Sequence, residues 1–372
     1  MKTLYLHIGM PRTATTVLQK FCAENQEELN RQGYCYPVMP FQYRNANQLR
    51  TAHFMFGRVP DENGKRDIER EKQYFREGFE ALYHTFEKYD NVILSDEGLW
   101  NCGFRDADSV WAKLKREMDA NHFITKVIVY LRRQDDFLFS WWSQRIKEGL
   151  YQECVLSWEE MTQQLPIVHL DYCGMLENIS EYVGKENLIV RRFDKKYFIG
   201  NSIYEDFVNV IGLQYSDTFK VQTRTLNRSL TKNNAEIKRL LNKLPDLDAH
   251  GNLMFQNTLA HNSNSKTDNQ RYSMFSKQEA LAMYEKYREG NLFIAEQYMG
   301  LEEDLFPFEY SAEQKWSPEN EEMLEDIVLF MGTSLLRMEK ELQAQKKEIA
   351  YLKSVVQHPL KRFVNKIKKK LK

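Results

Sequence analysis

The sequence predicts an α/β fold, in which a parallel β-sheet is flanked by helices, followed by a helical C-terminal extension. Short segments rich in β-branched, aromatic and other apolar residues alternate along the chain with longer segments of helical pattern. The first apolar segment ends in a glycine and leads at once into a threonine-rich stretch, which is typical of a strand that turns into an anion-binding helix. Ligands of parallel sheets bind at the carboxyl ends of the strands, so polar residues there are the first candidates for a site.

Five segments are expected to form strands. They are bounded by polar or turn residues and have the apolar, β-branched composition of buried strands. The strongest of them ends in two arginines. In chain order, the expected strands are residues 3–8 (TLYLHI), 33–37 (GYCYP), 91–97 (NVILSDE), 123–133 (FITKVIVYLRR) and 187–194 (NLIVRRFD).

The segments between the strands have helical patterns. Residues 66–89 are heavily charged, as in a solvated helix, and Gly149 is a typical helix stop. The polar, Asn-rich residues 250–270 are expected to form a long mobile loop. The expected helices are residues 13–31, 66–89, 134–149, 203–213 and 276–298.

The composition excludes several classes of protein. A hydrophobic fraction of 42% allows a packed core, and a formal net charge of −1 argues against bulk binding of nucleic acid. The five cysteines are odd in number and form no C-x-x-C pair, so we expect neither a disulfide framework nor a metal site, and a reducing, cytoplasmic location. The N-terminal apolar stretch is too short for a signal peptide, and no window approaches the 18 apolar residues of a membrane span.

Residues 9–16 (GMPRTATT) have the composition of an anion-binding loop. Gly9 allows close backbone approach, threonine hydroxyls add donors, and a helix N-terminus presents free N–H groups with a positive dipole end. The nearest general motif is the P-loop, G-x-x-x-x-G-K-[ST]. Here Ala14 stands at its second glycine, and the lysine that should reach the β- and γ-phosphates is missing. The alternative interpretation is a tight strand-to-helix turn with a threonine cap.

A second segment favours an anion site. Arg132 stands at the end of the strongest expected strand, and Ser140 follows eight positions later in the next helix. A guanidinium fork and a hydroxyl that converge from a strand end and a helix suit a phosphate monoester. The alternative is a surface arginine and a serine in a helix interior, which is a common pairing.

Together these segments resemble the sulfotransferases that use 3′-phosphoadenosine-5′-phosphosulfate (PAPS). In that family a loop of the form P-[KR]-[ST]-G-T-T binds the 5′-phosphosulfate, and a later strand-end arginine with a serine eight residues on holds the 3′-phosphate. MPRTATTVLQ and RRQDDFLFS match both patterns in the right order, about 120 residues apart. The form HIG-x-x-[KR]-T-x-T-T-x-LQ is most similar to the bacterial branch associated with surface polysaccharides. The resemblance covers residues 1–215, and LNRSL at 226–230 and GNLFIAEQYMG at 290–300 extend it weakly.

The resemblance implies a sulfotransferase fold, related to that of P-loop proteins, and a metal-independent reaction. The enzyme would move a sulfuryl group from PAPS to a hydroxyl or an amine of a glycan-type acceptor. Arg12 would be catalytic, and Arg132 and Ser140 would hold the 3′-phosphate. The implied donor-binding residues are Arg12, Thr13, Ala14, Thr15, Thr16, Arg132 and Ser140.

The loop departs from the family pattern at two positions. Ala14 stands where glycine is usual, which costs little stability if the backbone there is already helical. Arg12 stands where lysine is common; it keeps the charge and adds a bidentate fork, but it cannot give up a proton.

A hydroxyl acceptor requires a general base. Glu97 follows an expected strand at a position where related bacterial sequences look like S-[SD]-E, and Asp96 is its rival. Alternatively, both are solvated loop carboxylates. His53 would line the acceptor cleft or be an ordinary helix histidine, and His7 is expected to be packed within its strand rather than catalytic.

For several other polar and aromatic residues, two interpretations remain open. One of Arg191 and Arg192 would face the donor while the other faces solvent. Trp100, Trp141 and Trp142 would stack on sugar rings or pack in the core.

Two other classes of protein compete with a sulfotransferase. The first is a P-loop nucleotide kinase, against which the missing lysine counts, together with the lack of an apolar strand that ends in a Mg²⁺-binding aspartate beside the loop. The second is a non-catalytic scaffold on a degenerate sulfotransferase fold, suggested by a C-terminus that resembles an interaction module.

The chain is expected to divide into a domain of residues 1–310, a long helix of residues 318–357 and a basic tail of residues 358–372. Within the long helix, a heptad pattern predicts a coiled coil and a homo-oligomer. Its a and d positions are Leu335, Met338, Leu342, Gln345, Ile349, Leu352 and Val356. The alternative is a helix that packs on its own domain.

The tail is expected to bind an anionic membrane at its inner face. It carries seven lysines and arginines and no acid, while the rest of the chain has a net charge of −8. An apolar stripe with a wholly basic remainder suits an anionic bilayer surface, and a solvated disordered tail is the alternative. The stripe is Leu360, Phe363, Val364, Ile367 and Leu371.

Overall fold

The computed structural model describes residues 1–43, 47–56, 59–102, 109–149, 152–163, 170–221, 230–264 and 271–357. The chain forms two compact units. The first comprises residues 1–141, 160–227 and 275–315, and the second comprises residues 142–159, 228–274 and 316–372. The units interleave along the chain, and a single functional domain of residues 1–310 stays a prediction.

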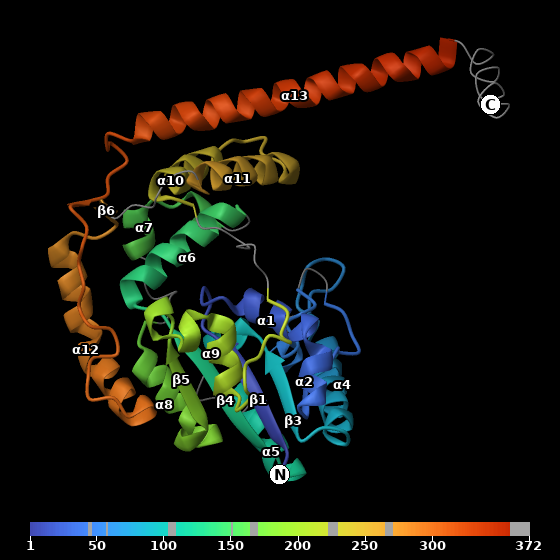
Figure 1. Cartoon of the computed structure of the whole chain (residues 1–372), viewed down its shortest axis with the longest axis vertical. Coiled ribbons are helices and arrows are strands. Elements are labelled where there is room, and N and C mark those ends of the chain that lie inside the picture. The colour runs from blue at the N-terminus through green and yellow to red at the C-terminus, as the bar shows by residue number, and fades with distance from the viewer. Residues whose placement is uncertain are drawn as a thin grey trace. The chain divides into compact units, whose positions relative to one another are not determined.

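A five-stranded parallel sheet forms the centre of the first unit (Figure 1). All of its strand pairs are parallel, so all carboxyl ends lie at one edge. The predicted α/β fold class is therefore confirmed, and each expected strand is present. The strands are β1 (Thr3–Gly9), β2 (Tyr34–Cys35), β3 (Asn91–Ser95), β4 (Ile124–Leu131) and β5 (Leu188–Arg192), in the order β2-β3-β1-β4-β5.

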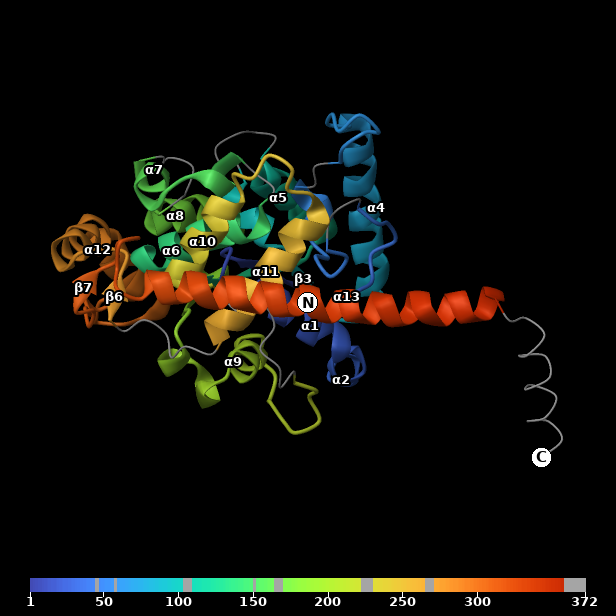
Figure 2. The same cartoon turned by 90° about the horizontal axis from the view of Figure 1, so that it is seen from above.

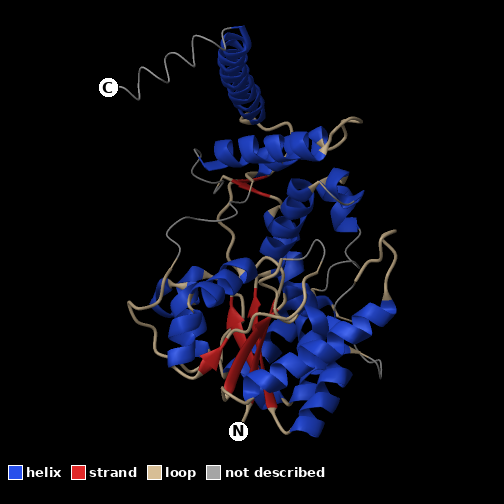
Figure 3. Cartoon of the chain, turned by 90° about the vertical axis from the view of Figure 1, so that its right-hand side faces the viewer, coloured by secondary structure: helices blue, strands red, loops and turns tan. Residues whose placement is uncertain are grey.

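Helices cover both faces of this sheet (Figure 3). Apolar side chains of α1 (Thr15–Glu24), α2 (Gln26–Arg31) and α9 (Ile203–Val210) share one core cluster with those of β1, β3 and β4. The other helices of this unit are α3 (His53–Phe56), α4 (Ile68–Phe86), α5 (Val110–Asn121), α8 (Tyr172–Val183) and α12 (Lys277–Met299). Its short elements are η1 (Glu97–Asn101), η4 (Lys185–Asn187), η5 (Lys195–Tyr197), η6 (Ile199–Asn201) and β7 (Gln314–Lys315).

Two of the expected helices differ from the prediction. The helix expected over residues 13–31 is two helices, separated at Asn25, whose side-chain amide donates to the carbonyls of Phe21 and Lys220 at 2.9 Å each. The helix expected over residues 66–89 is α4, but it is not simply solvated. One of its faces is buried, because its apolar residues recur at helical spacing. The buried apolar residues are Tyr74, Phe79, Leu82 and Phe86.

The second unit is helical, apart from the short strand β6 (Tyr272–Ser273), in its described residues. The long loop expected over residues 250–270 is wrong for residues 250–264, which belong to a helix. Asparagine and histidine are weak helix formers, but packing against α10 and α13 stabilises the helix and buries Leu259. The helices of this unit are α10 (Lys232–Leu241), α11 (Ala249–Asn264), α13 (Met323–Gln357) and η2 (Gln152–Val155), while α6 (Gln134–Glu148) and α7 (Trp158–Gln163) contribute to both units.

The C-terminal extension is a long helix, as predicted. α13 spans 35 residues and contacts α10 and α11 near its start. Figures 1 and 2 both show it continuing beyond these two helices. In the described part of the chain, no helix combines the length and apolar character needed to cross a bilayer. The predicted basic tail, residues 358–372, lies outside the described residues.

Candidate functional site

The loop after β1 has a left-handed backbone at three positions. Gly9 has a φ of 74°, Arg12 of 71° and Ala14 of 60°. Glycine adopts this conformation freely, whereas each other residue is destabilised by roughly 1–2 kcal/mol. Such strain persists only where the surrounding structure enforces it, and it is common at functional sites.

The backbone of Ala14 is not helical, so the condition under which alanine would cost little is not met. Ala14 is the residue before α1, with φ 60° and ψ 24° in the left-handed region, and α1 begins at Thr15. The family's usual glycine would fit this conformation without strain. Ala14 is therefore a strained position in this chain, at the place where the family pattern has glycine.

Close packing explains why a glycine ends β1. A Cβ atom on Gly9 would lie 2.6 Å from Cγ2 of Thr15 and 3.2 Å from Cβ of Glu97. The loop after β1 and the residues after β3 are thus in direct contact at Gly9. Any larger residue would push them apart.

The predicted threonines differ in their surroundings. Thr13 is fully buried, and its hydroxyl donates to the carbonyl of Met10 at 2.6 Å, which fixes the turn. Thr15 is also buried, whereas Thr16 is exposed. Of the three threonines, Thr16 is the one exposed to solvent, and Thr13 acts on the shape of the loop.

The structure brings together Arg12, Arg132 and Ser140. Nε of Arg12 donates to Oγ of Ser140 at 2.9 Å, although 128 positions separate them in the chain. Nη1 of Arg132 donates to the carbonyl of Arg12 at 3.3 Å. The sheet order explains this meeting, because β4 is the neighbour of β1. Two guanidinium groups and a hydroxyl therefore gather at one end of the sheet.

The main chain and the side chain of Arg132 are held from two sides. The hydroxyl of Tyr172 on α8 donates to the Arg132 carbonyl at 2.9 Å. The Arg132 guanidinium lies 5.9 Å from the centre of the Phe193 ring, a cation–π distance. These contacts limit the positions that the guanidinium can take.

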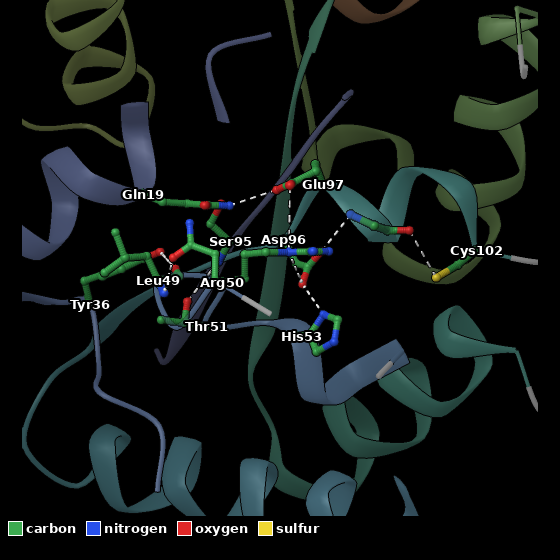
Figure 4. A network of polar contacts seen from close by, with 12 residues as sticks. Gln19, Tyr36, Leu49, Arg50, Thr51, His53, Ser95, Asp96, Glu97 and Cys102 are labelled. Carbon is green, nitrogen blue, oxygen red and sulfur yellow. Dashed lines mark hydrogen bonds and ion pairs between the residues drawn. The ribbon is translucent and has the colours of Figure 1, made fainter. Parts of the chain in front are cut away.

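Asp96, the first residue after β3, is the centre of a network of ion pairs (Figure 4). Its carboxylate accepts from Nη2 of Arg50 at 2.5 Å and from Nδ1 of His53 at 2.9 Å. It also accepts from the backbone N–H of Gly98 at 2.6 Å, and its side chain has no solvent exposure. Asp96 is therefore engaged on all sides by donors.

Glu97 has a different environment from its neighbour. Its carboxylate accepts from Nε2 of Gln19 at 2.9 Å and lies 3.8 Å from Nε of Arg50. A quarter of its side chain is exposed, 24%. Of the two carboxylates, Glu97 is the one that a dissolved molecule can reach.

Both histidines in this region are buried. Nδ1 of His7 lies 2.9 Å from Oγ of Ser95, and burial lowers the pKa of His7 to about 4. His7 is therefore neutral at physiological pH and packs within the sheet. His53 is buried, pairs with Asp96 at 2.9 Å, and its ring meets that of Tyr43 at 4.4 Å, so a place for it in the acceptor cleft stays a prediction.

Gln19 and Arg50 belong to the site although neither was predicted to do so. Gln19 links the two loops, because its Nε2 donates to Glu97 and lies 3.3 Å from Oγ of Ser95. Its signal in the sequence is a polar residue between Leu18 and Phe21 on an apolar helix. Arg50 carries no such signal, since its partners are 46 and 47 positions away.

Arg191 and Arg192 both have protein partners, while a contact of either one with the donor stays a prediction. Arg191 donates to the buried carboxylate of Asp206. Arg192 is buried rather than solvated, pairs with Glu303 at 2.7 Å and lies over the Tyr197 ring. Both arginines hold β5 to neighbouring segments.

The tryptophans are mostly core residues. Trp100 and Trp142 are buried, with Trp100 edge-on to Tyr172. Trp142 donates its indole N–H to the carbonyl of Leu156 at 3.0 Å. Core packing therefore accounts for these two side chains, and Trp141 is half-buried.

The neighbourhood of the β1 loop differs from the expectation stated against a nucleotide kinase. An apolar strand that ends in an aspartate does lie beside the loop, since β3 pairs with β1 and Asp96 follows it. Its carboxylate, however, is buried and already bound to Arg50 and His53. Among the residues that the structure describes, no group of three or more metal-ligating side chains is present.

Comparison with known proteins gives distant similarities. No model of a known protein family matches the chain. Over 211 residues, 56% of this chain, it is 24% identical to an uncharacterized protein of Archaeoglobus fulgidus, and it spans about half of that relative's length, 54%. A solved sulfotransferase from Alicyclobacillus acidocaldarius is similar with a TM-score of 0.37 and 14% identity, over 61% of this chain and 87% of the other. Neither similarity is high enough to assign the chain to a family.

Proposed function

We propose that the chain is a sulfotransferase, which moves a sulfuryl group from PAPS to a hydroxyl or an amine of a glycan-type acceptor. The observation that carries the proposal is the meeting of the two sequence motifs. The Arg12 side chain bonds Ser140, and Arg132 bonds the Arg12 carbonyl, from segments more than a hundred positions apart. Chance surface residues would have no reason to converge in this way.

The residues present fit the donor. Arg12 and the backbone N–H groups at the start of α1 would hold the phosphosulfate, because they combine a cation with a helix N-terminus. Arg132 and Ser140 would hold the 3′-phosphate by charge-assisted and hydroxyl hydrogen bonds. The donor supplies an activated sulfuryl group on a phosphate oxygen, and these side chains would orient it.

Glu97 would be the general base. It would take the proton that the acceptor hydroxyl loses as its oxygen forms a bond to sulfur. Arg12 would stabilise the negative charge that remains on the phosphate oxygen when its bond to sulfur breaks. Asp96 would position Arg50 and His53 instead, since its carboxylate is buried among donors.

The two competing classes make different predictions. A nucleotide kinase would bind ATP–Mg²⁺, and no observation on Asp96 favours a magnesium ligand. A non-catalytic scaffold would bind 3′,5′-adenosine diphosphate without turnover. Only the sulfotransferase would transfer sulfate.

A transfer assay tests the proposal. Full-length protein is incubated with PAPS labelled in the sulfuryl group and with a panel of glycan oligosaccharides. We expect label in at least one oligosaccharide, together with an equal amount of 3′,5′-adenosine diphosphate. Transfer of phosphate from ATP instead, or no transfer to any acceptor of the panel or of a surface-polysaccharide extract, would contradict the proposal.

The location is part of the proposal and rests on the sequence alone. A cytoplasmic enzyme would sit at the inner face of the membrane through the basic residues 358–372, where each cation contributes about 1 kcal/mol to binding an anionic surface. Sedimentation with anionic liposomes at low salt tests this. Protein without residues 358–372 should stay in the supernatant, and a full-length protein that does so as well would contradict it.

A further inference from the structure

A pocket of about 390 Å³ lies beside the Asp96 network, a size typical of small-ligand sites. Two tyrosines, Tyr43 and Tyr74, line it, and their rings meet edge-on at 5.0 Å. The Tyr43 ring also meets the His53 ring at 4.4 Å, and His53 bonds Asp96 at 2.9 Å. Two contacts, Tyr43 with His53 and His53 with Asp96, thus connect the pocket to Asp96, the residue before Glu97.

The hydroxyl of Tyr43 lacks a hydrogen-bond partner among the described residues, although it is buried. A buried hydroxyl without a partner is destabilising by roughly 1–3 kcal/mol. Burial also raises the pKa of Tyr43, so the phenol keeps its proton and remains a donor. A ligand that supplies an acceptor atom here would remove this destabilisation.

The charges around the pocket are mainly negative. Asp61, Glu62 and Asp67 line it, with Arg70 as the one basic residue among the described lining residues. Nε of Arg70 donates to the Tyr74 hydroxyl at 3.2 Å, and its guanidinium lies 5.6 Å from the centre of that ring. An anionic ligand would therefore be repelled, while a neutral or cationic one would not.

We propose that this pocket binds a sugar ring of the acceptor and selects neutral or amine-bearing sugars over sugars that carry a carboxylate or a sulfate. The proposal rests on the proposed function. A tyrosine side chain among polar lining residues suits a sugar, which has an apolar ring face and a rim of hydroxyls. Because Tyr43 contacts His53, a sugar ring in the pocket would lie near the Asp96 network. The sugar group that accepts the sulfuryl group has to be near Glu97, next to this network.

Calorimetric titration of the full chain with three tetrasaccharides, without donor, tests the pocket. The probes are chitotetraose, which is neutral, its deacetylated form, which carries amines, and a hyaluronan tetrasaccharide, which carries carboxylates. We expect the first two to bind and hyaluronan to bind at least tenfold more weakly. Equal or tighter binding of hyaluronan, or no binding of any probe, would overturn the proposal.

Two variants and a control locate the binding. Glu62 is exposed, so Glu62→Lys should keep the fold. It should reduce the ratio of the affinity for chitotetraose to the affinity for the hyaluronan tetrasaccharide by roughly five- to tenfold. Tyr43→Phe keeps the packing and should weaken chitotetraose binding severalfold by removing the hydroxyl. The control is Tyr351→Ala on α13, which should bind as the wild type does. Unchanged binding by both pocket variants would place the site elsewhere.

The same samples separate this proposal from the proposed function. Titration with 3′,5′-adenosine diphosphate should give equal affinities for the wild type, Glu62→Lys and Tyr43→Phe. If sugars bind as expected but the nucleotide does not, the pocket is a sugar site on a protein that is not a sulfotransferase. If only the nucleotide binds, the donor site stands and the pocket proposal fails.

A second inference concerns the far part of α13. Near its start, Phe330 is buried and Asp326 accepts from the Asn233 side chain of α10 at 2.8 Å. From Leu335 on, the apolar side chains of the heptad pattern are about half exposed within the described residues. Their exposed fractions are 62% for Leu335, 54% for Met338, 45% for Leu342, 51% for Ile349 and 50% for Leu352.

The charges beside the apolar heptad residues of α13 favour pairing with a parallel second copy of this helix. With Leu335 at position a, Glu341 and Glu348 occupy g positions, and Lys346 and Lys353 occupy e positions. In a parallel pair in register, each g residue faces the next e residue of the other helix, so both glutamates would meet lysines. In an antiparallel pair, g faces g and e faces e, which would place like charges together.

We infer that this surface binds a second copy of the chain as a parallel, in-register coiled coil. Gln345 at a d position would meet Gln345 of the partner subunit, and such a polar layer fixes register and orientation. Three heptads form a short coiled coil, so the dimer should be reversible and depend on concentration.

Oxidative cross-linking tests the orientation. In a parallel, in-register pair, Leu342→Cys places both thiols at the same a layer, and air oxidation should give a covalent dimer. Lys347→Cys, on the outer f position of the same helix, is the matched control and should not cross-link faster than the wild type. Equal cross-linking of the two variants, or a wild type that stays monomeric by light scattering at all concentrations, would overturn the inference.

Charge reversal gives a second test. Glu341→Lys with Glu348→Lys should be monomeric where the wild type dimerises, because every facing g–e pair becomes lysine with lysine. A mixture with the Lys346→Glu, Lys353→Glu variant should form a heterodimer. If the reversed variants dimerise alone as well as the wild type does, these charges do not face each other.

Discussion

Two loops leave the same edge of the sheet from neighbouring parallel strands, and they carry opposite charge. The loop after β1 presents Arg12 on a strained, left-handed backbone, with Arg132 and Ser140 beside it. The residues after β3 are the carboxylates Asp96 and Glu97. The cationic loop after β1 can bind an anion, and a carboxylate after β3 can accept a proton. Binding of the donor and activation of the acceptor would therefore belong to different loops.

The two loops are separate but not independent. Gly9 allows the β3 residues to pack directly on the β1 loop. His7, Ser95, Gln19 and Glu97 form a chain of polar contacts that crosses from one strand to the other. A substitution in one loop should therefore leave the function of the other loop intact only if it preserves these polar contacts and the packing at Gly9.

The largest effect is expected for the cationic loop. Arg12→Ala should reduce transfer by about 10²–10³-fold, because it removes a preorganised donor to the departing oxygen. Steady-state rates with labelled PAPS give the number. Arg31→Ala, a surface arginine that pairs with Glu28, is the control and should keep wild-type rates. Near wild-type turnover by folded Arg12→Ala protein would remove the loop from the site.

The carboxylate loop should divide into a chemical and a structural residue. Glu97→Gln should lower turnover by about 10²-fold and leave the affinity for 3′,5′-adenosine diphosphate unchanged, because it removes only the base. Asp96→Asn should lower the free energy of unfolding by about 3 kcal/mol, since it breaks a buried ion pair. Urea unfolding and transfer rates of both variants check this. A stable, inactive Asp96→Asn protein and an active Glu97→Gln protein would reverse the roles.

The residues beside the cationic loop should recognise the 3′-phosphate. Arg132→Ala should weaken 3′,5′-adenosine diphosphate by about tenfold to a hundredfold, and Ser140→Ala by about fivefold, in line with charged and neutral hydrogen bonds. Adenosine 5′-monophosphate should be affected much less. Arg133→Ala is the matched control, because Arg133 pairs with Asp135 instead. Equal losses for both nucleotides would mean that the 3′-phosphate is bound elsewhere.

His7, which links the two strands, should make stability depend on pH. Its pKa is lowered to about 4 by burial, so between pH 6.5 and 4 the unfolded chain binds a proton that the folded chain does not. Stability should fall by about 2 kcal/mol from pH 7 to pH 5 through this residue. Urea unfolding of His7→Gln should show a smaller fall by that amount, and the exposed control His84→Gln should not. An unchanged fall in His7→Gln would mean that His7 is protonated in the fold.

The smallest effect is expected at the strained alanine. Ala14→Gly should raise the free energy of unfolding by about 0.5 kcal/mol, because relief of the left-handed strain slightly exceeds the added freedom of the unfolded chain. Ala81→Gly, within α4, should lower it by about 1 kcal/mol. Thermal unfolding of both variants gives the comparison, and a destabilised Ala14→Gly would contradict the left-handed backbone.

The sequence was sufficient for the sheet because each strand carries its own signal. β1, β3 and β4 are short apolar runs that end in polar residues, and these ends are where the site lies. No local sequence signal predicts the order of the strands in the sheet. The pairing of β3 with β1 is therefore seen only in the structure. The helix α11 was missed for a related reason, since tertiary packing rather than composition stabilises it.

Within the site, charged residues at strand ends were predictable and their partners were not. Arg12, Arg132, Ser140 and Glu97 stand in recognisable patterns. The pairing of Asp96 with Arg50, and thus the different environments of Asp96 and Glu97, depends on contacts across 46 positions. The left-handed backbone of Ala14 depends on the packing around Gly9, which no propensity describes.

Titration of the wild-type protein with three nucleotides tests the central claim most directly. The cationic loop, Arg132 and Ser140 should together bind 3′,5′-adenosine diphosphate, with adenosine 5′-monophosphate at least tenfold weaker because it lacks the 3′-phosphate. ATP–Mg²⁺ should bind more weakly than either. Binding of ATP–Mg²⁺ in preference to 3′,5′-adenosine diphosphate, or no difference between the two adenosine nucleotides with and without the 3′-phosphate, would contradict the assignment of this edge of the sheet to PAPS.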